Sequence, residues 1–321
     1  MTDSHEPDAH EPDAHEPDAH ALGMTWAGDT TFNRLPRRRS AAGADLAVVG
    51  VAFDLAVTNR PGARFGPRAV REQSTLSGEF GDSLWPWPSG MLRGRTTIDA
   101  GDVAFRPGST DEMLVATRSR VSALVGQGAG VVSIGGDHLV TYPLLQAHFE
   151  HYGQMALVHF DAHSDTWEYE ADAPLHHGMM FLQAAREGLI DPARSVQIGM
   201  RTPNETKGFN VFDMNAVVDL GVGGLVDAVR SLTSGSPIYL TVDVDALDPA
   251  FAPATGTPVA GGMTTAQLRG VLFKLLGLDI VGADVVEVAP HYEGPAQITA
   301  LAGATIAHDE LHLLAGSPRR N

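Results

Sequence analysis

Short apolar runs rich in β-branched residues alternate with helical patterns from Ala44 almost to the end of the chain. This alternation is typical of a parallel sheet covered by helices, because consecutive parallel strands need a crossover that a helix provides. It predicts an α/β fold, a three-layer α/β/α sandwich around a mostly parallel sheet of about eight strands. Strands are expected at residues 46–51, 96–99, 130–134, 155–160, 195–199, 216–218, 237–242 and 280–288, and the clearest helices at 111–127, 138–152, 225–233, 264–275 and 297–314.

The first residues differ from the rest of the chain in composition. Glu-Pro-Asp-Ala-His occurs three times in succession between Glu6 and His20, without Lys or Arg. Because such a segment has too little apolar surface to offset the entropy of ordering, residues 1–22 are expected to form a disordered acidic tail. Its histidines could capture metal weakly, but a solvated tail is favoured because nothing fixes the imidazoles in one geometry. Residues 23–321 contain no linker-like stretch and are expected to form a single catalytic domain.

Charge and composition exclude several classes of partner. The formal net charge of −17 argues against nucleic acid, since phosphate binding needs clustered Lys and Arg, and it favours small cationic molecules. Because the chain has no cysteine, any metal must be held by His, carboxylates, carbonyls or water, a donor set that favours manganese-like or magnesium-like ions. No apolar run approaches membrane-spanning length, and the start of the chain lacks a signal-peptide pattern. We therefore expect a cytoplasmic protein with no membrane partner.

Polar residues gather where predicted strands end. Gly135-Gly136-Asp137-His138 follows the strand at 130–134, Asp161 follows the strand at 155–160, and Asp243 follows the strand at 237–242. Glu287 lies near the end of the strand at 280–288. Because ligands bind outside the carboxyl ends of parallel strands, these groups are expected to face one crevice.

Histidine and aspartate alternate at two-residue spacing within residues 159–165, and a similar aspartate pair lies within residues 241–245. Taken singly, a strand-terminal Asp often caps a helix, and a His after glycines is more often structural. Together they provide two sites of mixed nitrogen and oxygen ligation if two carboxylates bridge. Four carboxylates packed this closely would repel one another unless cations intervene. The sequence therefore predicts a centre for two divalent metal ions, built from two histidines and four aspartates of these segments.

These residues belong to motifs that resemble the ureohydrolase superfamily, the family of arginases and agmatinases. The resemblance is closest to bacterial agmatinases and extends from about Phe32 almost to the C-terminus. The matching segments are residues 60–67, 135–138, 156–165, 177–178, 188–192, 243–249, 252–258 and 285–290.

The resemblance implies two Mn²⁺ ions per chain and a set of roles for individual residues. One ion would be held by His138, Asp161, Asp165 and Asp243 and the other by His163, Asp161, Asp243 and Asp245, so that Asp161 and Asp243 bridge. We expect Asp165 to carry a proton to the leaving amine, His177 to exchange protons near the substrate, and Glu287 to bind the guanidinium through two parallel N–H bonds. His159 does not match a ligand position and is expected in the core or beside the ligands.

The implied activity is hydrolysis of agmatine to putrescine and urea, a step of polyamine biosynthesis, by attack of a metal-bridging hydroxide on the guanidinium carbon. The acidic segment at 166–172 would attract the distal amine of agmatine, although each acid alone could simply face solvent. Met179, Ala254 and Asn59 depart from the usual agmatinase pattern and leave open guanidinobutyrate, guanidinopropionate or guanidine as the substrate. A non-catalytic binding homologue is less favoured, because all six candidate ligands are present. The resemblance also implies a homo-oligomer, a trimer or a hexamer.

Overall fold

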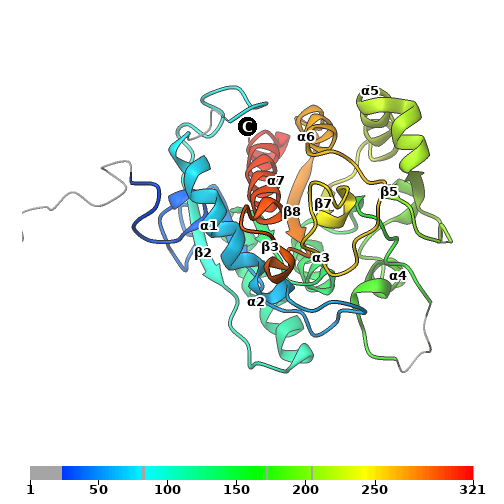
Figure 1. Ribbon diagram of the computed structural model, residues 1–321, viewed down its shortest axis with the longest axis horizontal. Helices are drawn as coiled ribbons and strands as arrows, with labels where there is room; N and C mark the ends of the chain where they lie inside the picture. Colours follow the sequence, from blue (N-terminus) through cyan, green and yellow to red (C-terminus); the bar gives the residue numbers. More distant parts are fainter. Residues whose placement is uncertain (1–23, 81–83, 169, 171–172, 204, 321) are drawn as a thin grey trace, which may run out of the picture.

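A parallel sheet forms the centre of the molecule (Figure 1). The computed structural model describes residues 24–80, 84–168, 170, 173–203 and 205–320, and the predicted acidic tail at 1–22 lies outside them. In the described part, eight strands pair only in parallel, in the order β2-β1-β3-β8-β7-β4-β5-β6. They are β1 (Leu46–Gly50), β2 (Thr97–Asp102), β3 (Gly130–Ile134), β4 (Ala156–Phe160), β5 (Val196–Met200), β6 (Asn210–Asp213), β7 (Ile238–Asp243) and β8 (Ile280–Val286).

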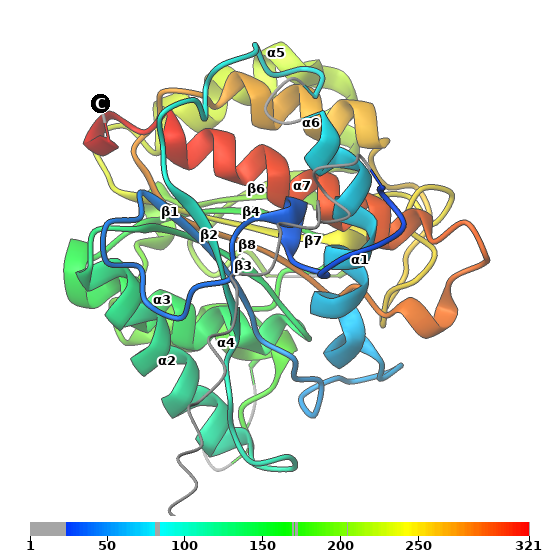
Figure 2. The same ribbon diagram turned by 90° about the vertical axis from the view of Figure 1, so that its left-hand side faces the viewer.

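Helices cover both faces of the sheet, as Figure 2 shows. One layer contains α1 (Gly66–Glu79), α5 (Met214–Leu232), α6 (Thr265–Lys274) and α7 (Ile298–Ala315), and the other contains α2 (Thr110–Gly126), α3 (Thr141–Tyr152) and α4 (Met180–Arg186). Alternate residues of one strand enter different cores: in β4, Val158 packs toward the first layer and Leu157 toward the second. The three-layer α/β/α sandwich is thereby confirmed. Within the described residues, no helix is both long and apolar enough to cross a membrane.

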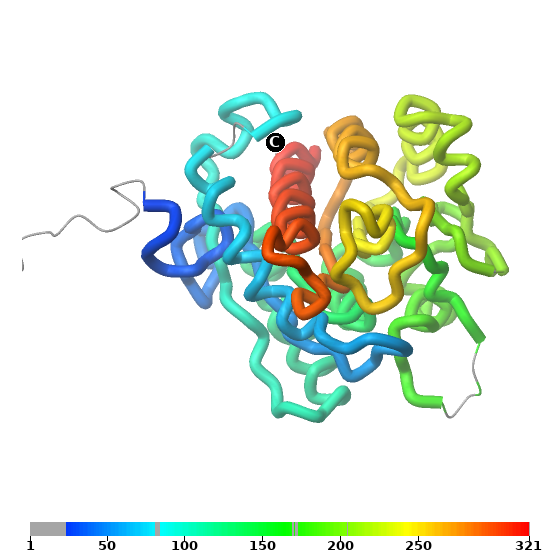
Figure 3. Tube along the Cα trace, viewed as in Figure 1, coloured from blue at the N-terminus to red at the C-terminus, as the bar shows by residue number. Residues whose placement is uncertain are grey.

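The strands that precede the predicted functional residues are neighbours in the middle of the sheet. They follow one another in the order β3-β8-β7-β4, although β8 is the last strand along the sequence. Because parallel strands point the same way, the loops that follow these four strands meet at one edge of the sheet. The topology therefore brings together segments that are far apart in the sequence, as the colours of the chain trace in Figure 3 show.

Local signals correctly predict some element boundaries. The capping sequence predicted at Thr264 and Gln267 is confirmed, since each side chain hydrogen-bonds the backbone of the other residue at the start of α6. The helix predicted at 138–152 corresponds to a short turn at His138–Val140 that leads directly into α3.

The strand predicted at 216–218 is wrong, because these residues lie in the first turns of α5. The Asp213 side chain accepts the N–H of Ala216 at 2.8 Å and so caps the helix, while the strand itself ends at Asp213. The helix predicted at 225–233 corresponds to the second half of α5, which follows a kink at Gly221, where φ is 59° and ψ is 179°. No helix is predicted at α1 or α4. Helix α1 begins with Gly66-Pro67, which resembles a loop, and it packs against α7 in the tertiary structure.

Arg71 ties α1 to the edge of the sheet and provides a test of the fold. Its guanidinium donates to the Asp99 carboxylate of β2 at 2.8 and 3.1 Å, and both side chains are buried. We expect Arg71→Met to lower the free energy of unfolding by about 3–5 kcal/mol, because it leaves a buried carboxylate without its counter-charge. Chemical denaturation followed by circular dichroism measures this loss.

The matched control is Arg68→Met on the same helix. Arg68 is exposed and pairs with Glu72 one turn along at 3.0 Å, so its removal is expected to cost less than about 1 kcal/mol. Equal losses in the two variants would contradict a special role for the buried pair.

Candidate metal centre

The predicted ligands lie in the loops at the carboxyl ends of the central strands. His138 begins the turn after β3, Asp161, His163 and Asp165 follow β4, and Asp243 and Asp245 lie at the end of β7 and in the turn after it. A Cβ at Gly136 would lie 1.7 Å from the carbonyl oxygen of Phe53. Only glycine therefore allows the loop before His138 to pass so close to the neighbouring chain.

His138 and three aspartates form the first group. His138 Nδ1 lies 3.1 Å from Asp161 Oδ2, 3.1 Å from Asp165 Oδ2 and 3.4 Å from Asp243 Oδ2. All four side chains are buried. The structure thus brings together the four residues that the resemblance assigns to one ion.

His163 forms the second group with Asp161 and Asp245. Its Nδ1 lies 3.3 Å from Asp161 Oδ1 and 3.1 Å from Asp245 Oδ2. Asp161 therefore faces the two groups with different oxygens, which is the arrangement that a bridging carboxylate needs. Asp243 approaches His138 through Oδ2, while its Oδ1 accepts the N–H of Asp245 at 2.8 Å.

The hydrogen bonds around His138 decide which ring nitrogen faces the aspartates. His138 Nε2 lies 2.9 Å from Thr241 Oγ1, whose hydroxyl donates to Asp284 Oδ1 at 2.6 Å. Because the hydroxyl hydrogen is used, Nε2 must donate, and the lone pair of the neutral ring is on Nδ1. Nδ1 is buried and makes no hydrogen bond within the described part of the chain. A lone pair facing three carboxylates is the donor set of a hard divalent ion.

Burial of so many carboxylates perturbs their protonation in the metal-free protein. Burial, followed by the charges of Asp245 and Asp161, holds the pKa of Asp243 well above its usual range. Burial and the charge of Asp161 raise the pKa of Asp245 to about 6. Bound cations would relieve the repulsion that these shifts report, so the electrostatics favour metal binding.

Glu287 follows β8 and has one oxygen available. Its side chain is fully buried, and Oε1 accepts the backbone N–H of His138 at 2.9 Å and lies 3.0 Å from His177 Nδ1. Oε2 has no hydrogen-bond partner among the described residues. A buried carboxylate oxygen without a donor is unusual and can accept an N–H group of a ligand. Since Oε1 already receives two donors, Oε2 is the better acceptor.

Hydrogen bonds hold both ring nitrogens of His177. Nε2 accepts the backbone N–H of Thr58 at 3.0 Å, so the neutral ring donates from Nδ1 to Glu287. Burial disfavours a charged ring, but the hydrogen bond and charge of Glu287 outweigh it and raise the pKa of His177 to about 9. The Thr58 backbone N–H opposes that charge, because it cannot donate to a protonated nitrogen, whereas the Thr58 hydroxyl oxygen, 2.8 Å from Nε2, can accept from it. Sequence reasoning missed Thr58, since no motif in its loop indicates the contact.

His159 lies beside the centre, in contact with Asp161. Its Nε2 is 2.8 Å from Asp161 Oδ2, and its Nδ1 receives the Gln197 amide at 3.2 Å. The same amide donates to the Ser164 carbonyl at 2.6 Å, which sets its orientation. His159 therefore donates to Asp161 and orients the carboxylate that both groups share.

Basic residues partly neutralise the negative charge of the acidic segment at 166–172. The Glu168 carboxylate pairs with Lys207 at 3.0 Å and with Arg186 at 3.6 Å. The sequence alone does not indicate this compensation, because both basic residues are distant along the chain. Tyr169, Ala171 and Asp172 lie outside the described residues.

Asn59 and Ala254, two departures from the agmatinase pattern, occupy loops near Glu287. Asn59 Nδ2 donates to the Gly256 carbonyl at 2.8 Å, and a Cβ at Gly256 would lie 3.3 Å from Glu287 Oε2. Asn59 thus tethers the loop that faces the available oxygen. Ala254 is buried, and its carbonyl accepts the Ala289 N–H at 2.9 Å. The third departure, Met179, is half-buried directly before α4.

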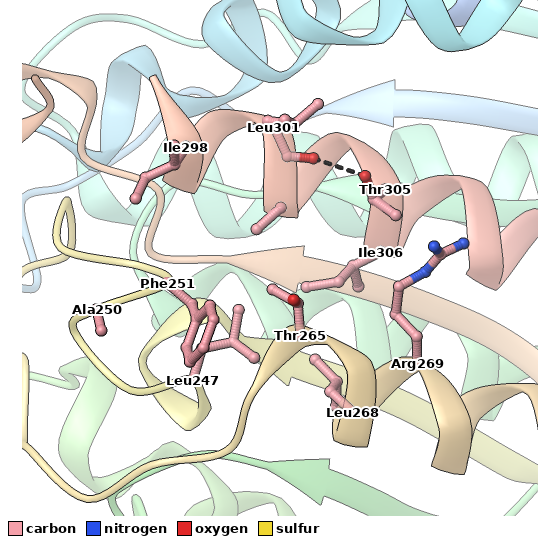
Figure 4. A pocket seen from close by; sticks show the side chains of 11 residues that line it. Leu247, Ala250, Phe251, Thr265, Leu268, Arg269, Ile298, Leu301, Thr305 and Ile306 are labelled. Carbon is pink, nitrogen blue, oxygen red and sulfur yellow. Dashed lines mark hydrogen bonds between the residues drawn. The ribbon is translucent and has the colours of Figure 1, made fainter. Parts of the chain in front are cut away.

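An apolar pocket of about 300 Å³ lies elsewhere, between α6, α7 and the segment after β7 (Figure 4). Its lining includes Leu247, Phe251, Leu268 and Ile306. The guanidinium of Arg269 at its edge is bound by Asp309 at 2.7 and 2.8 Å. No carboxylate or imidazole lines this pocket, so it lacks ligands for a cation.

Comparisons with known proteins identify the family of this chain. The sequence model of the arginase family matches residues 44–312. The agmatinase of Proteus mirabilis is 48% identical over 273 residues, which cover 85% of this chain and 88% of that protein. The agmatinase of Escherichia coli is 46% identical over 274 residues, again covering 85% of this chain and 88% of the relative.

Solved structures similar to this chain point to the same family. A hypothetical agmatinase from Burkholderia thailandensis superposes with a TM-score of 0.87 at 44% identity, covering 91% of this chain and 92% of that one. The proclavaminate amidino hydrolase of Streptomyces clavuligerus superposes with a TM-score of 0.85 at 37% identity, covering 92% and 99%. The chain belongs to the arginase family.

Proposed function

We propose that the protein is an agmatinase, a metal-dependent hydrolase that converts agmatine to putrescine and urea. One observation carries the proposal: two donor groups share Asp161 and lie next to the buried Glu287 carboxylate, whose Oε2 lacks a donor. An anionic acceptor at this position suits the planar, cationic guanidinium group. The agmatinases of Proteus mirabilis and Escherichia coli, similar over most of their length, support the same substrate.

Two Mn²⁺ ions are the proposed cofactors. His138, Asp161, Asp165 and Asp243 would hold one ion, and His163, Asp161, Asp243 and Asp245 would hold the other. When bound, the ions lower the pKa of a water molecule and so supply a nucleophile at neutral pH. The absence of cysteine and the nitrogen and oxygen donors support manganese over softer ions.

The residues around the centre bind the substrate and move protons. Glu287 Oε2 accepts an N–H of the guanidinium and orients its carbon for attack by water. The bond from this carbon to the alkylamine nitrogen then breaks and releases urea. Asp165 takes a proton from the attacking water and delivers it to the leaving amine. His177, between Glu287 and Thr58, exchanges protons between the amine product and solvent.

Another guanidino compound is the alternative substrate, with guanidinobutyrate, guanidinopropionate and guanidine as candidates. The ion pairs of Glu168 with Lys207 and Arg186 favour this alternative, because they weaken the acidic character that would reject a carboxylate-bearing substrate. A non-catalytic binding protein is a low-ranked alternative, since all candidate ligands are in place. Cytoplasmic location and assembly into a trimer or hexamer stay predictions from the sequence.

Substrate identity is tested with manganese-loaded protein and four compounds: agmatine, arginine, guanidinobutyrate and guanidine. We expect the highest kcat/KM for agmatine, measured as urea release. Rapid release from another compound with none from agmatine would exclude agmatinase activity. No release from any of them, with two metals bound per chain, would support the binding-protein alternative.

The bridging assignment is tested with Asp161→Asn. We expect this variant to retain fewer than two Mn²⁺ ions per chain and to lose urea release, because both groups share the Asp161 carboxylate. Metal content after gel filtration measures the first effect. Asp219→Asn, at an exposed position of α5, is the control and should retain both ions. Two retained ions and full activity in Asp161→Asn would show that Asp161 does not bridge.

The role of Glu287 is tested with Glu287→Gln. We expect kcat/KM for agmatine to fall roughly 10- to 100-fold, because a neutral amide replaces the charged acceptor of the guanidinium. Steady-state kinetics at matched metal content measure this. Glu168→Gln, in the exposed segment, is expected to change kcat/KM much less, since ion pairs already compensate its charge. A larger effect at Glu168 would place substrate recognition in the acidic segment instead.

A further inference from the structure

We propose that Thr241 and Asp284 are positioning residues: through the Thr241 hydroxyl, Asp284 holds the His138 imidazole with its Nδ1 lone pair directed at the aspartates. This inference rests on the proposed function, because it assumes that His138 binds a metal ion. Neither Thr241 nor Asp284 contacts the substrate or the reacting atoms in this scheme. Their contribution is to the geometry and tautomer of one ligand.

The two residues are placed by the sheet register. Thr241 of β7 and Asp284 of β8 are direct cross-strand partners in the parallel ladder. Asp284 Oδ1 accepts the Thr241 hydroxyl at 2.6 Å, and Thr241 Oγ1 lies 2.9 Å from His138 Nε2. All three side chains are fully buried, so water does not compete for these hydrogen bonds.

The hydrogen bonds that link His138, Thr241 and Asp284 form a relay. Its donor direction follows from the groups that surround Asp284. Tyr239 and Thr141 donate their hydroxyls to Oδ2 at 2.8 and 3.0 Å, and Thr241 donates to Oδ1. With its hydrogen committed to Asp284, the Thr241 oxygen can only accept from His138 Nε2. Nε2 then keeps the proton, and Nδ1 is the nitrogen left to bind a cation.

Burying polar side chains costs free energy, and a positioning role explains why these are buried here. Thr241 and Asp284 are polar side chains buried in the interior of β7 and β8. Polar partners behind a histidine ligand fix its tautomer and ring orientation, and their loss typically lowers metal affinity about 10- to 100-fold. The relay touches His138 and not His163, so the effect is expected at one of the two ions.

The test is Mn²⁺ titration of the metal-free protein, with free Mn²⁺ counted by electron paramagnetic resonance. Thr241→Val keeps the shape of the side chain and removes the hydroxyl, and we expect one of the two ions to bind roughly 10- to 100-fold more weakly. Thr241→Ser restores the hydroxyl and is expected to restore the affinity. Circular dichroism confirms that each variant is folded.

Tyr239→Phe is the matched control, because it removes a hydrogen bond to the other oxygen of Asp284 and leaves the link to His138 intact. We expect unchanged Mn²⁺ affinity in this variant, with lower thermal stability. Wild-type affinity in folded Thr241→Val would overturn the inference. Equal loss of affinity in Thr241→Val and Tyr239→Phe would also overturn it, because the loss would then follow the buried network as a whole.

The same titration separates this inference from the proposed function. If the wild-type protein binds fewer than two ions, the proposed metal centre itself is wrong, and the inference falls with it. If the wild type binds two ions but releases no urea from agmatine, only the proposed substrate is wrong. Weaker binding in Thr241→Val would then still support the positioning role.

Discussion

The burial of aspartates at one edge of the sheet is the constraint on which the rest of this structure depends. Each of three aspartates gives one oxygen to a backbone N–H: Asp161 accepts from His163, Asp243 from Asp245, and Asp245 from Ala162. These bonds fix the carboxylates but do not neutralise them, and burial, together with repulsion between neighbouring carboxylates, raises the pKa values of Asp243 and Asp245. A divalent cation would remove that repulsion, and the lone pair of His138 Nδ1 completes its set of donors.

The parallel sheet makes this concentration of charge possible. Helices bury both faces, so β3, β4, β7 and β8 can be largely apolar, and most of the candidate donors lie where these strands end. Hydrogen bonds of these strands and two hydrophobic cores then hold the loops in place. The free energy that offsets the burial of charge thus comes from packing distant from the centre itself.

Glu287 connects the candidate metal centre to the proposed substrate. Its Oε1 joins the backbone of His138 to the ring of His177, and its Oε2 remains available opposite the loop that Asn59 tethers. A change in that loop can therefore alter substrate choice without touching a metal ligand.

The fold class and the candidate ligands could be predicted because both depend on local patterns. Apolar runs of strand length mark a parallel sheet, and alternating His and Asp at strand ends mark the donors, whatever their partners are. The misplaced strand at 216–218 shows the limit of such patterns, since a single side-chain cap at Asp213 decides between helix and strand there.

By itself, the sequence determined which side chains are available for metal and guanidinium binding. Only the tertiary structure decided which atoms of these side chains are used. Asp161 faces two groups, His138 directs Nδ1 at the aspartates, and Glu287 leaves Oε2 available, because partners such as Thr241, Asp284 and Thr58 occupy other atoms of the site. Those partners come from other strands and loops, and hydrogen bonds between segments distant in sequence leave no local pattern to read.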